Sequence, residues 1–320
     1  MQHSIDIRFY PGWTRKAITF SIDDGNVPMD EKFINILRPA GIHGTFNLCS
    51  HNLGYLTPEQ YREFYKGDEI ANHCKYHPFA FVDGKEYRIS EEAFDEASAN
   101  PELLYRTDTE QLYRVHKVNG WRNITDADGY CAFIDAGKQE LEEVFGKGSV
   151  RSYVWPFQQQ ECQKVLDHLK LRFEQGVYYG VRKSGEKGAE EGFPLPVCRL
   201  PWHYTATHAN LLEYAERYEA QPDDGELKFF CIGVHSIDYE RAGKWDVLQA
   251  FADRYGHRPQ DYFYAPVGEI FDYADALDRI EITEHTVKNP TDRDLYIRVD
   301  DRNVVLKAGM EYILGGNGND

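Results

Sequence analysis

Short apolar runs alternate with longer amphipathic segments along most of the chain. The apolar runs have the length of buried strands, and the longer segments repeat their apolar residues with a helical period, as Phe133, Leu141 and Val144 show. Repeated strand–helix units of this kind are typical of a parallel sheet covered by helices. The pattern therefore predicts an α/β fold built around a parallel sheet.

The same pattern gives approximate boundaries for the elements. The expected strands are Ala17–Ser21, Gly44–Leu48, Glu69–Ala71, Ser152–Trp155, Phe173–Gly176, Val197–Leu200, Lys228–Val234 and Tyr262–Tyr264. The expected helices are Met29–Arg38, Pro58–Lys66, Ala132–Phe145, Gln158–Leu169, His208–Glu219, Lys244–Tyr255 and Pro266–Ala276.

Two segments interrupt the alternation. The first, from Phe79 to about Tyr130, is a polar and tyrosine-rich insertion with Trp121 near its end. Long loops on the active face of an enzyme commonly shape access to the site, and a peripheral flap is the alternative interpretation. Trp121 is accordingly a candidate for substrate binding.

The second segment is the tail that follows about Asp278. Alternating apolar and polar residues at 280–283, 295–299 and 310–314 predict a small antiparallel β appendage, and residues 315–320 resemble a frayed end. The expected division is a (β/α) unit over residues 1–278, with the insertion at about 79–130, and an appendage over residues 279–320. A structural cap or interface is favoured for the appendage over carbohydrate binding.

Length, charge and cysteine usage narrow the class of protein. A chain of 320 residues can bury a sizeable core in one large domain. The net charge of −17 argues against binding to nucleic acid or anionic membranes. The six cysteines are scattered, without a CxxC pair, which predicts reduced thiols. No signal peptide or membrane-spanning run is visible in the sequence. We therefore expect a cytoplasmic protein, and its oligomeric state, including a homo-oligomer, stays open.

The most informative chemistry lies in two short motifs. An apolar strand ends in the adjacent carboxylates of Asp23 and Asp24, and the segment NHCKYHP at 72–78 contains His73 and His77 in HxxxH spacing. Two imidazoles and one carboxylate make a metal site with positions left for water and substrate. The second carboxylate is then available as the base that a metal hydrolase needs.

These motifs resemble those of the polysaccharide deacetylases, the NodB-homology group called carbohydrate esterase family 4. Its T-F-D-D-G motif has a basic aspartate followed by a metal-binding one, and its H-[ST]-x-x-H motif supplies two metal-binding histidines. The resemblance implies that Asp23 is the general base and that Asp24, His73 and His77 bind one divalent ion. Cys74 replaces the usual serine or threonine. Zinc suits these ligands best, although cobalt, nickel or iron also accept them.

Further segments resemble the family in chain order. The strand at 229–235 ends in His235, like the L-x-H motif that carries the family's catalytic acid. Trp155, Pro156 and Phe157 resemble the R-x-P-Y motif, so the backbone amide of Phe157 is the implied oxyanion donor and Trp155 lies in the same site. The family's orienting arginine is missing, because Val154 stands at its position. The implied fold is a distorted, incomplete (β/α) barrel.

Arg199 is our candidate for the missing arginine, since it closes an expected strand late in the chain. In this interpretation its guanidinium pairs with Asp23, and Trp202 forms a wall around the acetyl methyl group. The alternative is a surface arginine beside a packed tryptophan, in which case Arg122 and Arg182 are the next candidates.

The sequence thus predicts a metal-dependent hydrolase that removes acetyl groups from an N-acetylated or O-acetylated sugar or oligosaccharide. Two alternatives remain open. One is another C–N hydrolase on the same fold, resembling the allantoinase-type members, and the other is a non-catalytic carbohydrate-binding relative.

Overall fold

The computed structural model describes residues 3–76, 127–156 and 163–315, together with the backbone of four short strands. Those strands are β5 (Ala80–Val82), β6 (Leu104–Arg106), β7 (Leu112–Arg114) and β8 (Ile124–Asp126). Most of the expected insertion therefore lies outside the described residues.

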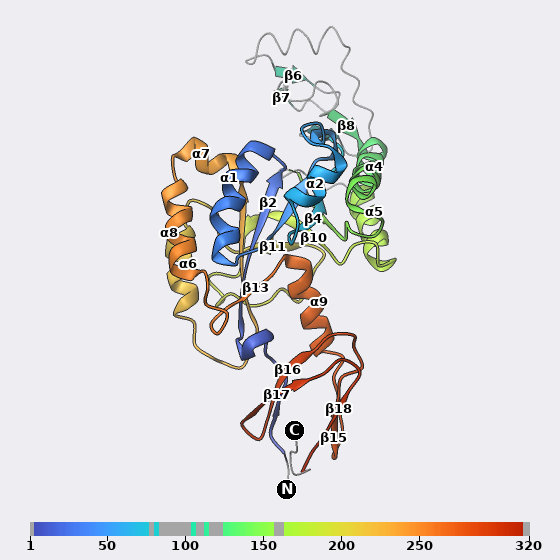
Figure 1. Ribbon diagram of the computed structural model, residues 1–320. Helices are drawn as coiled ribbons and strands as arrows, with labels where there is room; N and C mark the ends of the chain where they lie inside the picture. Colours follow the sequence, from blue (N-terminus) through green and yellow to red (C-terminus); the bar gives the residue numbers. More distant parts are fainter. Residues whose placement is uncertain are drawn as a thin grey trace.

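A mostly parallel sheet forms the centre of the molecule, with helices packed around it (Figure 1). Its strands follow the order β11-β10-β9-β4-β3-β2-β12, and β13 also pairs with β2. Their bounds are β2 Lys16–Asp24, β3 Gly44–Leu48, β4 Glu69–Asn72, β9 Ser152–Val154, β10 Gly180–Glu186, β11 Trp202–Tyr204, β12 Lys228–His235 and β13 Phe263–Tyr264.

The sheet curls into a barrel that is closed by a short contact. Beyond β11, the amide of Thr205 donates to the carbonyl of Cys231 at 2.8 Å, and the amide of Gly233 donates to the carbonyl of Ala206 at 2.9 Å. On the other side β4 meets β9 at the register pair Asn72–Tyr153. Because these two contacts are short, the barrel is distorted and incomplete. The mostly parallel sheet with helices around it confirms the expected α/β fold class.

Helices cover the outside of the barrel. Their bounds are α1 Val27–Leu37, α2 Pro58–Phe64, α4 Ala127–Phe145, α5 Gln163–Glu174, α6 Leu211–Glu219, α7 Ser236–Ala242, α8 Trp245–Tyr255 and α9 Val267–Leu277. Within the described ranges, none of these helices combines the length and apolar composition needed to span a bilayer. The cysteines at 49, 74, 131, 198 and 231 carry free thiols.

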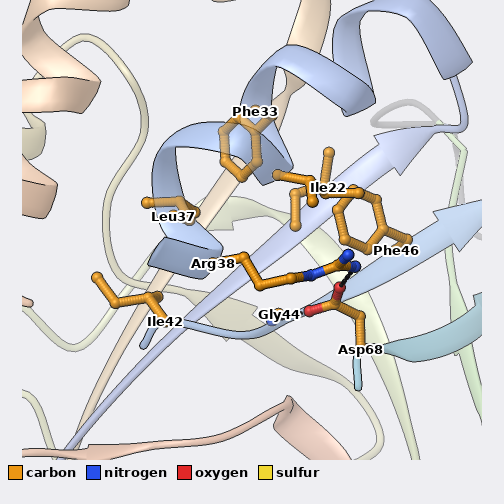
Figure 2. Close-up of a pocket in the computed structure, with 9 residues that line it drawn as sticks. Ile22, Phe33, Leu37, Arg38, Ile42, Gly44, Phe46 and Asp68 are labelled. Carbon is orange, nitrogen blue, oxygen red and sulfur yellow. Dashed lines mark hydrogen bonds and ion pairs between the residues drawn. The ribbon is translucent and has the colours of Figure 1, made fainter. Parts of the chain in front are cut away.

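Residues of β2 alternate between the helices and the barrel interior. Phe20 makes edge contacts with Phe33 of α1 and Phe251 of α8, and Ile18 and Ile22 belong to the same apolar cluster. Figure 2 shows the narrow crevice between α1, β2 and β3, which the ion pair of Arg38 and Asp68 borders. The crevice lies near Gly44, where β3 begins, and so away from the carboxyl ends of the strands.

Helix α9 is fixed to the barrel through its first turn. The amide of Val267 donates to Thr45 Oγ1 at 3.0 Å, and the amide of Gly268 donates to Glu69 Oε2 at 2.9 Å. A carboxylate suits this position because the start of a helix carries partial positive charge. The helix leads into the appendage, so these bonds set where the appendage joins the barrel.

The tail folds as the expected antiparallel β appendage. One sheet contains β14 (Glu281–Ile282), β15 (Thr286–Lys288) and β18 (Glu311–Ile313), and the other contains β16 (Leu295–Val299) and β17 (Arg302–Leu306). The N-terminal strand β1 (Ile5–Asp6) joins the second sheet, which the sequence did not predict. Figure 1 shows the appendage at the end of the barrel opposite α7.

Two expected strands are wrong, and two elements were not expected. The expected strand Phe173–Gly176 begins inside α5, and the expected strand Val197–Leu200 precedes β11. The strand that was missed is β10, whose sequence GVRKSGE lacks an apolar run. This polar segment is a strand because it pairs with β9 on one side and with β11 on the other. Helix α7 was also missed, since it follows β12 without a turn signal.

We expect the substitution Gly233→Ala to destabilise the barrel. A Cβ atom on Gly233 would lie 2.3 Å from the ring of Tyr204, which follows from the close approach of β11 to β12. Overpacking of this kind typically costs about 1–3 kcal/mol of unfolding free energy, measurable by urea denaturation. Gly54→Ala is the control, because no atom lies within 4 Å of its Cβ position. Equal stability of the two variants would contradict the prediction.

Candidate active site and metal centre

The carboxyl ends of four neighbouring strands bring the candidate residues together. In the register of the sheet Asp23 of β2 pairs with Asn47 of β3 and with His235 of β12. The amide of His73, which follows β4, donates to the carbonyl of Leu48 at 3.0 Å. Parallel strands that are aligned in this way place their terminal side chains at one edge, where (β/α) barrels form their active sites.

Asp23 is a buried carboxylate with two strong donors. Arg182 Nη2 donates to its Oδ1 at 2.6 Å and also contacts its Oδ2, and Asn47 Nδ2 donates to Oδ1 at 2.7 Å. Burial alone raises the pKa of this carboxyl, but the charges of Arg182, His73 and His235 outweigh it and hold the pKa below its usual value. The carboxylate is therefore both ionised and fixed in orientation.

Arg182 occupies the place of the missing arginine from a different strand. It lies on β10 in register with Val154 of β9, and its side chain is fully buried. Its guanidinium carbon lies 5.3 Å from the ring centre of Tyr204, inside the barrel. The neighbouring strand thus supplies the cation that Val154 cannot.

The expectation for Arg199 is wrong. Its guanidinium pairs with Asp275 of α9, at 2.7 and 2.6 Å, and stacks on the ring of Phe271 at 4.4 Å. Arg199 precedes β11, so it lies toward the amino end of that strand, whereas Asp23 lies near the carboxyl end of β2. Arg182, and not Arg199, contacts Asp23.

The expectation for Trp202 is also wrong. Its ring makes edge contacts with Phe229 and Phe271 in the apolar cluster beneath α9, so Trp202 packs in the core and does not form the expected wall. Trp155 is likewise buried, with its ring against Tyr130 and Tyr153. The predicted contact of Trp155 with substrate therefore has no support in this packing.

His73 is held with one ring nitrogen toward Asp24. Its Nδ1 is 2.9 Å from the carbonyl oxygen of Val154, so Nδ1 carries the proton and donates it. Its Nε2 then lies 3.5 Å from Asp24 Oδ1. Asp24 itself has a φ of 80°, a left-handed conformation that turns its side chain away from the line of β2.

A possible metal site is formed by Asp24, Cys49 and His73. One ligand atom from each residue lies within 4.8 Å of the other two. Carboxylate, thiol and imidazole together suit zinc or another late divalent metal, and the three atoms fit one ion. The third ligand expected from sequence, His77, lies outside the described residues, as do Phe157, Trp121 and Arg122.

His235 faces Asp24 from the opposite side. Its Nδ1 donates to Asp238 Oδ2 at 2.9 Å, and its Nε2 lies 3.9 Å from Asp24 Oδ2. Burial lowers the pKa of this imidazole, but the hydrogen bond to Asp238 and the charges of Asp23 and Asp24 raise it to about 9. Asp238 therefore fixes the orientation of the ring and favours its protonated form.

The sequence did not point to Asn47, Cys49 or Asp238 as site members, and it offered Arg182 only as a candidate after Arg199. Asn47 and Cys49 carried a usable signal, since Asn47 is the second-last residue of β3 and Cys49 directly follows that strand, between the two motifs. Arg182 carried no stronger signal, because its strand was not recognisable. Asp238 lies three residues after His235, in a helix that the pattern did not reveal.

The chain matches the family model described as "Polysaccharide deacetylase" over residues 12–173. No curated protein matches the sequence significantly.

Several solved structures are similar in fold. One is the Xyl-CE4 domain of a multidomain xylanase from the hindgut metagenome of Trinervitermes trinervoides, with 14% identity over 82% of this chain and 92% of that one, and a TM-score of 0.47. Another is a family 4 acetyl xylan esterase from Clostridium thermocellum, solved with a cobalt ion, with 12% identity, 80% and 91% coverage and a TM-score of 0.44. A third is a peptidoglycan deacetylase from Bacillus subtilis, with 14% identity, 82% and 95% coverage and a TM-score of 0.43.

The two arginines should differ in their contribution to stability. Arg182→Ala leaves the carboxylate of Asp23 buried without its partner, and loss of one member of a buried pair commonly costs about 3–5 kcal/mol of unfolding free energy. Arg199→Ala removes an ion pair to the half-exposed Asp275, which is worth about 0–1 kcal/mol. Urea denaturation of both variants checks this expectation, and a larger loss for Arg199→Ala would refute it.

Proposed function

The chain belongs to the polysaccharide deacetylase family, and we propose that its reaction takes place at the carboxyl ends of β2, β3, β4 and β12. Members of this family are hydrolases that remove acetyl groups from carbohydrates. The observation that carries this proposal is the buried carboxylate of Asp23, held by Arg182 and lying beside the pair of Asp24 and His73. One ionised group is thus available as a base next to a separate metal-binding group.

Enzymes of this family use a divalent metal ion. Here we propose that the ion binds to Asp24 and His73, with His77 as a further ligand, and that it is zinc. When bound, such an ion supplies a Lewis acid for the acetyl carbonyl and acidifies a water molecule. The other parts of the reaction are assigned to side chains of this chain.

Asp23 is the proposed general base. Its carboxylate would accept the proton of the attacking water, and the donors Arg182 and Asn47 leave it little freedom to rotate. A single guanidinium nitrogen, Nη2 of Arg182, contacts both carboxylate oxygens and so holds the position of the carboxylate as well as its charge. Removing this support would leave the base present but poorly directed.

His235 is the proposed general acid. An amine leaving group must receive a proton as the C–N bond breaks, and an alkoxide leaving group from an O-acetyl ester has the same need. Asp238 holds the Nδ1 proton of His235, so that Nε2 points toward the side of Asp24 where substrate would bind. The backbone amide of Phe157 remains the proposed donor to the oxyanion.

The substrate class can be tested directly. We expect the zinc-loaded protein to release acetate from N-acetylated or O-acetylated sugar oligomers, and the activity to be lost after treatment with a chelator and restored by zinc. Parallel assays on chitin oligosaccharides and acetylated xylan oligosaccharides distinguish amide from ester substrates. Release of ammonia or carboxylate from a small amide, without release of acetate from any sugar, would instead favour a different C–N hydrolase.

Adjacent carboxylates should respond differently to the same substitution. We expect Asp23→Asn to retain the metal ion and to lower kcat by about 10²–10⁴-fold, since an amide cannot accept the proton of water. Asp24→Asn should lower the metal content, because it removes an anionic ligand. Elemental analysis and acetate release, measured on both variants, check the assignment. Loss of metal from Asp23→Asn alone would reverse the roles of the two residues.

A further inference from the structure

Cys49 lies between the two residues of the metal-binding pair because of the order of strands. Strand β3 lies between β2 and β4 in the sheet, and Leu48 pairs with Asp24 on one side and with Asn72 on the other. The residues that follow Leu48 and Asn72 are Cys49 and His73, so these two lie side by side one residue beyond the level of Asp24. The thiol is brought to this edge by the register of the strands.

Cys49 differs from the other buried cysteines in its surroundings. Cys74 and Cys231 each belong to an apolar cluster, whereas Cys49 belongs to none of the apolar clusters formed by the described residues. Its Sγ is 3.1 Å from the carbonyl oxygen of His73 and within 4.8 Å of ligand atoms of both Asp24 and His73. The position of this buried thiol, close to ligand atoms of Asp24 and His73, suits a metal ligand better than a side chain that only fills the core.

We propose that Cys49 is a protein ligand of the divalent cation, in addition to Asp24 and His73. The proposal rests on the proposed function, and it changes the expected ligand set from carboxylate and imidazole alone to one that includes a thiolate. The thiol and imidazole are 1% exposed and form the inner side of the site, while the Asp24 side chain is 40% exposed and lies at its mouth. The open side of the ion would then face the substrate.

The binding step is a simple exchange of cations. The thiol of Cys49 releases its proton to solvent, the hydrogen bond from Sγ to the carbonyl of His73 breaks, and the sulfur forms a bond to the ion. No oxidant or reductant takes part. A thiolate among the ligands favours zinc and cobalt over magnesium or calcium, which prefer oxygen donors.

Spectroscopy of the cobalt-loaded full chain tests the ligand itself. We expect an intense sulfur-to-cobalt charge-transfer band in the near ultraviolet, which Cys49→Ala abolishes. In the zinc-loaded protein, X-ray absorption should detect one sulfur at about 2.3 Å from the ion in the wild type and none in the variant. We also expect Cys49→Ala to weaken zinc binding at least about 10–100-fold, the range seen even for groups that support a ligand indirectly.

Cys231→Ala is the matched control, since it removes a buried thiol that lies in an apolar cluster on β12. It should keep both the band and the sulfur signal. Cys49→Val, whose side chain suits the extended backbone at this position, serves as a second variant if Cys49→Ala folds poorly, and circular dichroism monitors the fold of each.

The outcomes separate this inference from the proposed function. One cobalt ion per chain without the charge-transfer band, or an undiminished band in Cys49→Ala, would overturn the thiolate ligand while leaving a metal-dependent deacetylase intact. Failure of the wild type to bind cobalt or zinc at all would overturn both. A band that depends on Cys49 and not on Cys231 supports the proposal.

Discussion

The buried contact between Arg182 and Asp23 is the interaction on which the rest of the site depends. It crosses the inside of the barrel, because β10 and β2 are separated in the sheet by β9, β4 and β3. Two charges that are removed from water are tolerated only when they satisfy each other closely. The same contact therefore stabilises the barrel, ionises the carboxylate and directs it, so that fold and proposed chemistry cannot be altered separately here.

Side chains of β2 point alternately toward the helices and into the barrel, and this explains how the barrel accommodates the contact of Arg182 with Asp23. Phe20 and its apolar neighbours pack outward against the helices, while Ser21 and Asp23 point inward with Asn47. Burial of large side chains on the outer face supplies the main stabilisation, at about 25 cal/mol for each Å² of apolar surface. The interior can then hold polar groups, provided that their hydrogen bonds are made within the barrel.

The edge that carries Asp24 and His73 lies at one end of this scaffold, and the appendage lies at the other. His73 is oriented by the carbonyl of Val154, which links the site to β9 where the barrel is least regular. Helix α9 is held at the other end by Thr45 and Glu69, and it carries the appendage away from the site. A structural role for the appendage, and not a direct part in the reaction, is consistent with this arrangement.

The sequence by itself determined the alternation of strands and helices and the order of Asp23, Asp24, His73 and His235 along the chain. Residues that directly follow strands of a parallel sheet meet at one edge, so their proximity could be inferred from local pattern alone. Only the tertiary structure decided that Arg182 and not Arg199 contacts Asp23, and that Cys49 lies beside Asp24 and His73. Arg182 is 159 residues from Asp23, on a strand with no apolar run. The physical reason is that contacts across the barrel depend on the order of the strands and on how the sheet closes, which the hydrophobic pattern of a single segment does not encode.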